Sequence, residues 1–521
     1  MRSPRPTSPR RTPLGEVATL VGAPVPPGDA VVTGVTLDSR AVLPGDLYAA
    51  LPGARAHGAD FGPQVAAAGA AAVLTDADGA RRLVAAGVGL PVVVVEEPRA
   101  VLGAVAARVY GTEDLAVRMV GITGTNGKTT TAYLLHSALT ALGHEVGLIG
   151  TVETRIGPER VGSVRTTPEA PDLHALLAVM AERGLDTCVM EVSSHALAQH
   201  RVDGVVYDVS LFTNLSQDHL DFHRDMDDYF AAKASLFTPE RSRQGLVCAD
   251  DGWGRRLLGV ASVPVASLAT ASDSGSSTDV HPDWTVHPDD TDPAAFRLTG
   301  PDGVDLALRS SLPGDFNVTN TAMAAAALVL AGEAPERAGE AVLADPHVPG
   351  RMERVALGDS ATQPRAVVDY AHTPDAIAAA LRALRPTTPG TLVCVTGAGG
   401  DRDRDKRHAM GAAAAEVADL VVVTDDNPRS EDPAGIRAAV LEGVDAVRRE
   451  GRAVRVREVG DRRRAIREAV AAVAAEGAHA TVAVVGKGHE TGQEVGGVVH
   501  PFDDRDELRE ALRLAAGAVA P

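Results

Sequence analysis

A glycine-rich loop between a buried strand and a helix is the sequence feature that most constrains the fold. The apolar run VRMVGI (117–122) predicts the strand, and TTAYLLHSALTALG (130–143) predicts the helix after the loop. This order is typical of nucleotide-binding α/β domains, in which backbone N–H groups and a helix N-terminus surround phosphates. The loop therefore predicts a bound triphosphate, but it does not separate an ATPase, a kinase and a ligase.

The loop has the spacing G-x-x-G-K-T, in which the lysine neutralises phosphate charge and the next hydroxyl can bind Mg²⁺. It departs from the common phosphate-loop pattern, because Ile122 stands where the first glycine belongs. The residues expected to bind the nucleotide are Gly124, Thr125, Asn126, Gly127, Lys128, Thr129 and Thr130. We expect Lys128 to face the phosphates and Thr129 to contact the metal.

The length of 521 residues implies about three domains, because single cores stop growing at a smaller size. Strand and helix patterns predict a flexible tail (1–28), a small α/β domain (29–115), a central P-loop-type domain with a parallel sheet (116–348) and a Rossmann-like α/β domain (349–521). A polar stretch at about 265–295 is interpreted as a surface loop or irregular excursion of the central domain.

Composition argues against several classes of protein. The formal charge of −19 disfavours binding to nucleic acid, which needs clustered Lys and Arg. No run reaches the roughly 18 apolar residues of a membrane span. The three cysteines are far apart and lack C-x-x-C spacing, which favours a reducing compartment over disulfides or a zinc site. We expect a cytoplasmic protein, and we expect it to be a monomer.

Lysine is rare in this chain. Only four of the 50 basic residues are Lys, at positions 128, 233, 406 and 487. Where Lys appears in such a background, a site can require a compact ammonium or a nucleophilic amine, which the guanidinium of Arg cannot supply; chance is the alternative. Two further polar residues, Glu191 and His219, follow predicted strands, so they are candidate ligands of a second Mg²⁺.

Many motifs in one order resemble the Mur ligase family, and within it the members that add a diamino acid. The resemblance spans about residues 30–500 and rests on GTNGKTT (124–130), MEVSSHAL (190–197), TNLSQDHLDFH (213–223), GDFNVTN (314–320), GRMERV (350–355), DYAHTP (369–374), DNPR (426–429) and GKGHE (486–490). It implies that Lys233 is carboxylated by CO₂ and that this carbamate helps to position magnesium. It also implies that Glu191 and His219 bind metal.

The resemblance implies further ligand contacts in each domain. For ATP these are Asn317 and Arg351, with Asp369 and His372 near the domain junction. For the UDP-muramoyl dipeptide they are Leu37, Ser39, Thr166, Thr167, Ser193, Gln199 and Arg201. For diaminopimelate they are Arg402, Asp426, Asn427, Pro428, Arg429, Gly486 and Glu490. Lys406 and Lys487 fall beside these motifs.

The implied reaction is an ATP-dependent ligation. ATP phosphorylates the D-glutamate γ-carboxylate of the UDP-muramoyl dipeptide, and the amine of diaminopimelate attacks the acyl phosphate. The guanidinium of Arg429 suits the distal carboxylate of diaminopimelate, which lysine lacks. Closure of the third domain over the second is the expected gating motion.

Two alternatives stay open at this point. One is another amide ligase of the same superfamily, such as a folylpolyglutamate synthetase or a lysine-adding muramoyl ligase, against which DNPR and the segment TLDSRAVLPGDLYAALPG (36–53) argue. The other is a non-catalytic protein that binds ATP as a switch, which would leave Glu191, His219 and Lys233 without a role. The sequence does not distinguish the meso and LL forms of diaminopimelate.

Overall fold

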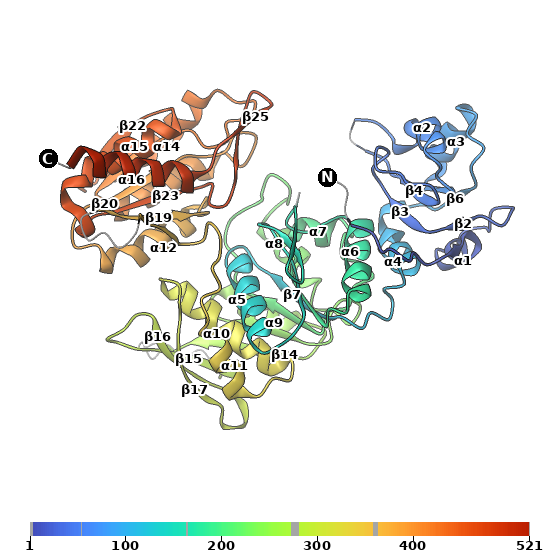
Figure 1. Ribbon diagram of the computed structural model, residues 1–521, viewed down its shortest axis with the longest axis horizontal. Coiled ribbons are helices and arrows are strands. Elements are labelled where there is room, and N and C mark those ends of the chain that lie inside the picture. The colour runs from blue at the N-terminus through green and yellow to red at the C-terminus, as the bar shows by residue number, and fades with distance from the viewer. Residues whose placement is uncertain (1–3, 54, 163–164, 272–280, 358–362, 520–521) are drawn as a thin grey trace.

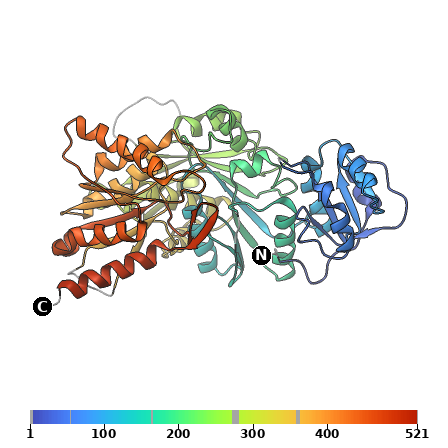
Figure 2. The ribbon, with the colours of Figure 1, turned by 90° about the horizontal axis from the view of Figure 1, so that it is seen from above.

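The computed structural model describes residues 4–53, 55–162, 165–271, 281–357 and 363–519. They form three α/β units, each built on its own mainly parallel sheet, as the sequence predicted. The N-terminal and C-terminal units lie at opposite ends of the molecule, with the central unit between them (Figures 1 and 2). In the described part of the chain, every helix is too short or too polar to cross a membrane.

The N-terminal unit has a parallel sheet of order β3-β4-β5-β6 beside a short β1-β2 pair. Its strands are β1 (Thr12–Pro13), β2 (Val31–Val32), β3 (Gly34–Thr36), β4 (Asp46–Ala50), β5 (Ala72–Thr75) and β6 (Val92–Val94). Its helices are α1 (Leu14–Leu20), α2 (Gly62–Ala67), α3 (Ala77–Ala85) and α4 (Pro98–Tyr110).

The prediction of a flexible tail up to residue 28 is wrong for the segment that forms β1 and α1. β1 pairs antiparallel with β2, and Leu14, Val17 and Ala18 of α1 are buried in the same core as α4. The apolar spacing of LGEVATL is too short to stand out in sequence. Pairing with a strand some twenty residues later stabilises it.

The central unit is an 11-stranded sheet of order β10-β9-β8-β11-β7-β12-β13-β14-β15-β16-β17. Its strands are β7 (Arg118–Thr123), β8 (Val146–Ile149), β9 (Thr154–Ile156), β10 (Glu159–Val161), β11 (Thr187–Glu191), β12 (Val209–Phe212), β13 (Gly245–Cys248), β14 (Val265–Thr270), β15 (Trp284–Pro288), β16 (Ala295–Thr299) and β17 (Asp305–Arg309). Its helices are α5 (Lys128–Ala141), α6 (Ala170–Glu182), α7 (Ser194–Ala198), α8 (Met226–Ala234), α9 (Gly252–Val260), α10 (Asp315–Leu330) and α11 (Pro335–Ala341).

Both faces of this sheet are covered, which explains the continuous apolar run of β7. Val120 and Ile122 belong to the core formed with α5 and α10, whereas Met119 belongs to the core formed with α6. Strands that are buried on both faces lose the polar alternation of half-exposed strands. The sheet therefore holds the loop after β7 between two layers of helices.

The interpretation of residues 265–295 as a loop is wrong in part. β14 and β15 extend the central sheet in parallel, and Trp284 in β15 is buried. The rest of this stretch includes 272–280, which lie outside the described residues. The polar composition concealed two short strands, of which only β15 has alternating buried apolar side chains, Trp284 and Val286.

The C-terminal unit is a six-stranded sheet of order β18-β19-β23-β20-β21-β22, with a separate β24-β25 hairpin. Its strands are β18 (Glu353–Val355), β19 (Arg365–Asp369), β20 (Leu392–Thr396), β21 (Leu420–Val423), β22 (Arg455–Glu458), β23 (Thr481–Val485), β24 (Gly492–Val495) and β25 (Val498–Pro501). Its helices are α12 (Pro374–Leu384), α13 (Lys406–Val417), α14 (Pro433–Arg449), α15 (Arg462–Val473) and α16 (Asp504–Val519). The helices α12, α13 and α14 cover one face, and α15 and α16 cover the other.

Candidate active site

A cavity of about 770 Å³ lies where β7, β11 and β12 end and where the C-terminal unit meets the central unit. In open α/β sheets, ligands bind outside the carboxyl ends of the strands. The predicted site residues that line the cavity are Thr125, Asn126, Gly127, Lys128, Thr129, Thr130, Thr166, Glu191, Ser193, His219, Lys233, Asn317, Arg351, Asp369 and His372. Sequence segments more than 220 residues apart thus meet around one space.

The loop after β7 is held in a conformation that only glycine tolerates at two positions. Gly127 has a φ of 86°, and a Cβ there would come within 2.5 Å of Asn320 Oδ1. Gly124 packs so closely on Thr213 that a side chain would collide with the Thr213 hydroxyl. Asn214 closes the loop, because its Oδ1 accepts from the backbone N–H of Asn126 at 2.9 Å. The turn is therefore fixed before any ligand binds.

Lys128 is the first residue of α5, and its ammonium folds back over the loop. Its Nζ donates to the carbonyls of Gly124 at 2.8 Å and Thr125 at 2.9 Å. Burial lowers the pKa of Lys128, and the negative charges of Glu191 and Asp218 oppose that shift. The ammonium is thus placed at the phosphate-binding turn.

Glu191 ends β11 and joins the loop to its neighbours. Its carboxylate accepts from the hydroxyl of Thr129 at 3.0 Å, and from the hydroxyl of Thr151 at 3.0 Å and its N–H at 2.8 Å. Arg351, from the C-terminal unit, donates to the Thr129 hydroxyl at 3.2 Å and lies 4.3 Å above the Tyr370 ring. Asn317 of α10 donates to the Pro313 carbonyl at 2.7 Å.

Lys233 on α8 is buried, with 1% of its surface exposed. Its Nζ donates to the Gly124 carbonyl at 2.7 Å and lies 4.7 Å from the centre of the Tyr229 ring. Burial lowers the pKa of Lys233 well below its usual value, and the nearby charge of Lys128 lowers it further, while Asp218 opposes both effects. A buried amine of this kind is neutral more often than an exposed one. The neutral form is the one that reacts with CO₂.

His219 lies in a cluster of rings at the cavity. It packs edge-on to His195 at 4.8 Å between centroids, and His195 stacks on Phe222 at 4.2 Å. Burial lowers the pKa of His219 to about 3, although Asp218 raises it. The ring is therefore held as a neutral base.

Oxygen atoms at the cavity wall fit Mg²⁺ better than the nearby imidazoles do. Among the described residues, no group of three or more His, Cys, Asp or Glu side chains could hold a metal ion. Thr129 and Glu191, however, present oxygen atoms 3.0 Å apart at the cavity wall. Mg²⁺ is commonly held by one or two protein oxygens together with phosphates and water. Those two residues fit that pattern, and the metal roles predicted for His219 and Lys233 stay predictions.

The residues predicted to contact the muramoyl dipeptide fall in two places. Thr166 accepts from the Thr151 hydroxyl at 3.0 Å, and Thr167 donates to the Glu191 carbonyl at 2.9 Å, so both lie beside the cavity. Ser193 is the N-cap of α7, and its hydroxyl accepts from the Ala196 N–H at 3.2 Å and from the Thr167 hydroxyl at 3.3 Å.

Arg201 and Gln199 lie farther along the same edge. Arg201 pairs with the carboxylate of Glu169 at 3.0 Å and donates to Gln199 Oε1 at 2.5 Å. Arg99 of the N-terminal unit pairs with the same Glu169 at 3.0 Å, so these groups join the two units. Leu37 and Ser39 follow β3 in the N-terminal unit, and the Ser39 carbonyl accepts from Gln64 at 3.5 Å.

The residues predicted to bind diaminopimelate gather in the C-terminal unit, at the ends of β20, β21 and β23. Asn427 donates to Glu490 Oε2 at 2.8 Å. Arg429 donates to the Gly400 carbonyl at 2.6 Å and pairs with Glu494 at 3.5 Å. Arg402 and Arg429 both approach Gly399. Asp426, Pro428 and Gly486 belong to the same turns.

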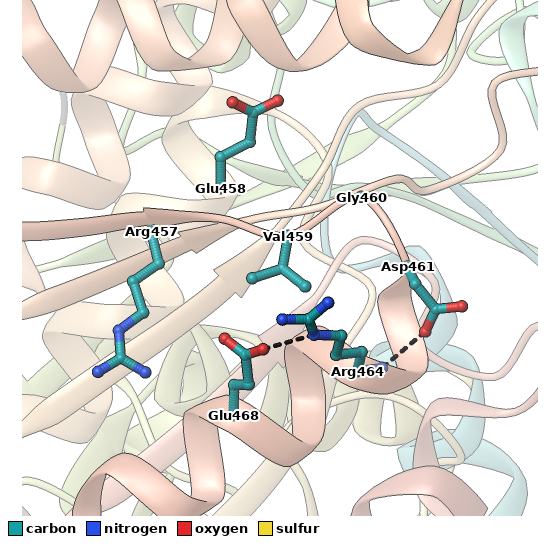
Figure 3. Close-up of a pocket in the computed structure, with 7 residues that line it drawn as sticks. All are labelled: Arg457, Glu458, Val459, Gly460, Asp461, Arg464 and Glu468. Atoms are coloured by element: carbon teal, nitrogen blue, oxygen red, sulfur yellow. Dashed lines mark hydrogen bonds and ion pairs between the residues drawn. The ribbon is translucent and has the colours of Figure 1, made fainter.

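A second, smaller pocket lies elsewhere on the C-terminal unit. It encloses about 400 Å³ where β22 leads into α15, and it is drawn in Figure 3. Its lining is Arg457, Glu458, Val459, Gly460, Asp461, Arg464 and Glu468, and none of these is a predicted site residue. Arg464 is paired with Glu468 at 2.6 Å, and Asp461 caps α15. The Arg464–Glu468 pair therefore lies within the pocket wall, and Glu458 pairs with Arg437 outside it.

Sequence reasoning missed several residues at the large cavity. Asn214 and Asp218 stand within TNLSQDHLDFH, where only His219 was singled out. Both line the cavity, and Asp218 is buried. The sequence did contain a signal, which is the run of polar residues directly after a strand. Polar side chains at the end of a parallel strand need partners, and ligands bind at that edge of the sheet. Thr151 and Tyr370 carried no comparable signal.

Three family models match the chain in sequence order. They are described as Mur ligase family, catalytic domain (residues 31–110), Mur ligase middle domain (122–328) and Mur ligase, glutamate ligase domain (350–488). The glycine-rich loop falls in the second match, and the turn 426–429 falls in the third.

Similar proteins span nearly the whole chain. A UDP-N-acetylmuramoyl-L-alanyl-D-glutamate--2,6-diaminopimelate ligase of Streptomyces coelicolor is 53% identical, with 99% of each chain covered. A protein of the same name from Corynebacterium glutamicum is 48% identical and covers 93% of this chain and 92% of its own. A solved structure described by that name superimposes with a TM-score of 0.64 at 29% identity, covering 97% of this chain and 100% of the other.

Proposed function

The chain belongs to the Mur ligase family, and from this premise we propose that it is the ATP-dependent ligase that adds 2,6-diaminopimelate to UDP-N-acetylmuramoyl-L-alanyl-D-glutamate. The amide forms at the D-glutamate γ-carboxylate, a step in peptidoglycan precursor synthesis. The observation that carries the proposal is the cavity in which the phosphate-binding turn, Glu191 and Arg351 of the C-terminal unit meet.

The first step transfers the γ-phosphoryl group of ATP to the γ-carboxylate, giving an acyl phosphate and ADP. The loop N–H groups and the N-terminus of α5 point at the phosphates, and the Lys128 ammonium offsets the charge that develops on the transferred group. Arg351 and Asn317 line the same cavity from the side of the C-terminal unit and α10, where they would hold the nucleotide.

Magnesium fits beside the phosphates. When bound, it would offset phosphate charge as a Lewis acid. Thr129 and Glu191 would hold it, and His219 and a carbamate on Lys233 would complete its surroundings. The lowered pKa of Lys233 supports this role, because a neutral primary amine is required to take up CO₂.

The second step joins the amine of diaminopimelate to the activated carboxyl group and releases phosphate. We propose that Arg429 and Arg402 bind the distal carboxylate, while Asp426, Asn427 and Glu490 bind the distal ammonium. Leu37, Ser39, Thr166, Thr167, Ser193, Gln199 and Arg201 would hold the UDP-muramoyl dipeptide. Diaminopimelate is thus held by the C-terminal unit, ATP mainly by the central unit and the UDP-muramoyl dipeptide by the N-terminal and central units. The proposed domains are 29–115, extended by β1 and α1, then 116–348 and 349–521.

We also propose that the protein acts in the cytoplasm and as a monomer. The three cysteines are free and buried, which suits the reducing cytoplasm. A monomer is proposed because residues of one chain supply every side of the cavity.

The test is ADP release by the purified protein with ATP, Mg²⁺ and the UDP-muramoyl dipeptide. Meso-diaminopimelate, LL-diaminopimelate and L-lysine are supplied in turn. Turnover with a diaminopimelate and not with lysine is expected. Turnover with lysine but with neither diaminopimelate would identify a lysine-adding ligase instead. ADP release that does not depend on any amino acid would favour an ATP-driven switch.

A further inference from the structure

Lys487 is a fully buried cation that the reaction steps above do not use. It follows Gly486 at the end of β23, and 0% of its surface is exposed. Its Nζ donates to Asn427 Oδ1 at 3.0 Å and to Glu490 Oε2 at 3.1 Å, and lies 3.4 Å from Asp426 Oδ1. One ammonium thus contacts all three side chains assigned above to the distal ammonium of diaminopimelate.

The contact fixes the orientation of the Asn427 amide. An ammonium has donors and no acceptor, so the amide must turn its oxygen toward Lys487. The backbone N–H of Glu494 donates to the same oxygen at 3.0 Å. The amide nitrogen is then directed away from Lys487, and it donates to Glu490 Oε2 at 2.8 Å. Lys487 and the Glu494 N–H therefore together determine the orientation of the Asn427 amide.

The contact also sets the charge of the cluster. Two carboxylates and one ammonium leave a net charge of −1, which matches one substrate ammonium. The side chain of Glu490 is 33% exposed and that of Asp426 is 9% exposed, whereas the ammonium of Lys487 is enclosed. A ligand can reach the carboxylates, but the lysine lies behind them.

We propose that Lys487 is a positioning residue for amino-acid recognition, which orients Asn427, Asp426 and Glu490 toward the distal ammonium of the incoming diamino acid. The inference rests on the proposed function. It assigns Lys487 to substrate selection and not to phosphoryl transfer. Without the lysine, the two carboxylates would repel each other and the Asn427 oxygen would lose one of its two donors.

The experiment compares full-length wild type with Lys487→Met and Lys487→Gln in steady-state assays of ADP release. The KM for diaminopimelate is expected to rise about tenfold to a hundredfold in Lys487→Met, the range for lost hydrogen bonds to charged groups. The KM of Lys487→Gln for diaminopimelate should lie between those of wild type and Lys487→Met, because the glutamine amide still donates one hydrogen bond to Asn427. The KM values for ATP and the UDP-muramoyl dipeptide should stay within about twofold of wild type.

Leu508→Ala is the matched control. Leu508 is buried on α16, in the core that α15 and α16 form on the other face of the sheet, and it is none of the recognition groups, so this variant lowers stability while those groups remain. Its melting temperature should fall while its KM for diaminopimelate is unchanged. An unchanged KM in both Lys487 variants would overturn the inference. Insolubility of both, with Leu508→Ala soluble, would assign Lys487 a structural role and also overturn it.

The wild-type assay separates this inference from the proposed function. If wild type shows no turnover with any diaminopimelate, both the proposed function and the inference that rests on it are wrong. If wild type turns over and the variants lose affinity for all three substrates equally, only the inference fails.

Discussion

The ammonium of Lys406 in the C-terminal unit lies 3.4 Å from the carboxylate of Asp218 in the central unit. His372 of the C-terminal unit lies 3.8 Å from the same carboxylate. Burial alone would raise the pKa of Asp218, but its interactions with the neighbouring His372, His219 and Lys406 side chains hold that pKa well below its usual value. The two units are therefore joined by charge at the edge of the cavity.

Replacing Lys406 by Met should loosen this junction. We expect kcat/KM to fall about tenfold or more. The Lys406–Asp218 contact forms only when the C-terminal unit is closed over the central unit, so its loss makes closure less favourable. Small-angle scattering with saturating ligands should give a larger radius of gyration than for wild type. Arg382→Met, an exposed cation on α12 of the same unit, is the control. Identical scattering profiles and rates for wild type and Lys406→Met would contradict the prediction.

The Asp218 contact should be insensitive to pH over the neutral range. Because the folded-state pKa of Asp218 is depressed, the stability it contributes is present above the unfolded pKa and is lost as pH falls through the folded value. In Asp218→Asn this contribution is missing at neutral pH, and the variant should approach wild type only in strong acid. Urea unfolding of both proteins from about pH 7 downward measures the difference. A difference that shrank between about pH 7 and about pH 5, or that grew below the unfolded pKa of about 4, would be inconsistent with this sign.

Lys128→Met should remove most of the turnover. The ammonium offsets charge that develops during phosphoryl transfer, so kcat should fall by about 10² to 10³. Binding of the UDP-muramoyl dipeptide, measured by calorimetry, should change little. Arg224→Met, an exposed cation near α8, controls for the loss of a positive charge. A variant that kept wild-type kcat would remove Lys128 from the phosphate site.

Activity should depend on dissolved CO₂ through Lys233. In buffer depleted of CO₂ the wild-type rate should fall, and bicarbonate should restore it, because the buried neutral amine must be carboxylated again. Lys233→Met should be inactive and should not respond to bicarbonate. Mass spectrometry under mild alkaline conditions can detect the added CO₂. A wild-type rate that is unaffected by CO₂ depletion would exclude the carbamate.

Arg429→Met should weaken the choice of amino acid. The loss of a guanidinium that pairs with the distal carboxylate should lower kcat/KM for diaminopimelate by about a hundredfold and change the rate with L-lysine little. The ratio of the two kcat/KM values is the measurement. Arg457→Met, exposed on β22 of the same unit, is the matched control. An unchanged ratio would remove Arg429 from selectivity.

The architecture was predictable because it depends on local patterns. The run at β7, the glycine-rich turn and α5 are adjacent in sequence, and strands buried on both faces show continuous apolar runs. The same holds for Glu191, since the last residue of β11 must lie at the ligand edge of a parallel sheet.

Contacts between distant segments were not predictable. The pairing of Lys406 with Asp218 depends on how two units pack, and the cluster around Lys487 joins turns about sixty residues apart. Sequence reasoning placed both lysines near the site but named no partner for either. The helix α1 was missed for the same reason, because the core that buries Leu14 is completed by α4, which begins at Pro98.

The scarcity of lysine makes amine-reactive chemistry a selective reporter on this protein. Lys128 and Lys233 line the cavity, Lys406 pairs with Asp218 at its edge, and Lys487 lies in the recognition cluster; Lys233 and Lys487 are enclosed. A mild acylating reagent should therefore modify the folded chain at few places other than its terminal amine, and Lys406 would label mainly when the units separate. Reagent uptake followed by peptide mass spectrometry would then measure opening of the molecule in solution, without any engineered probe.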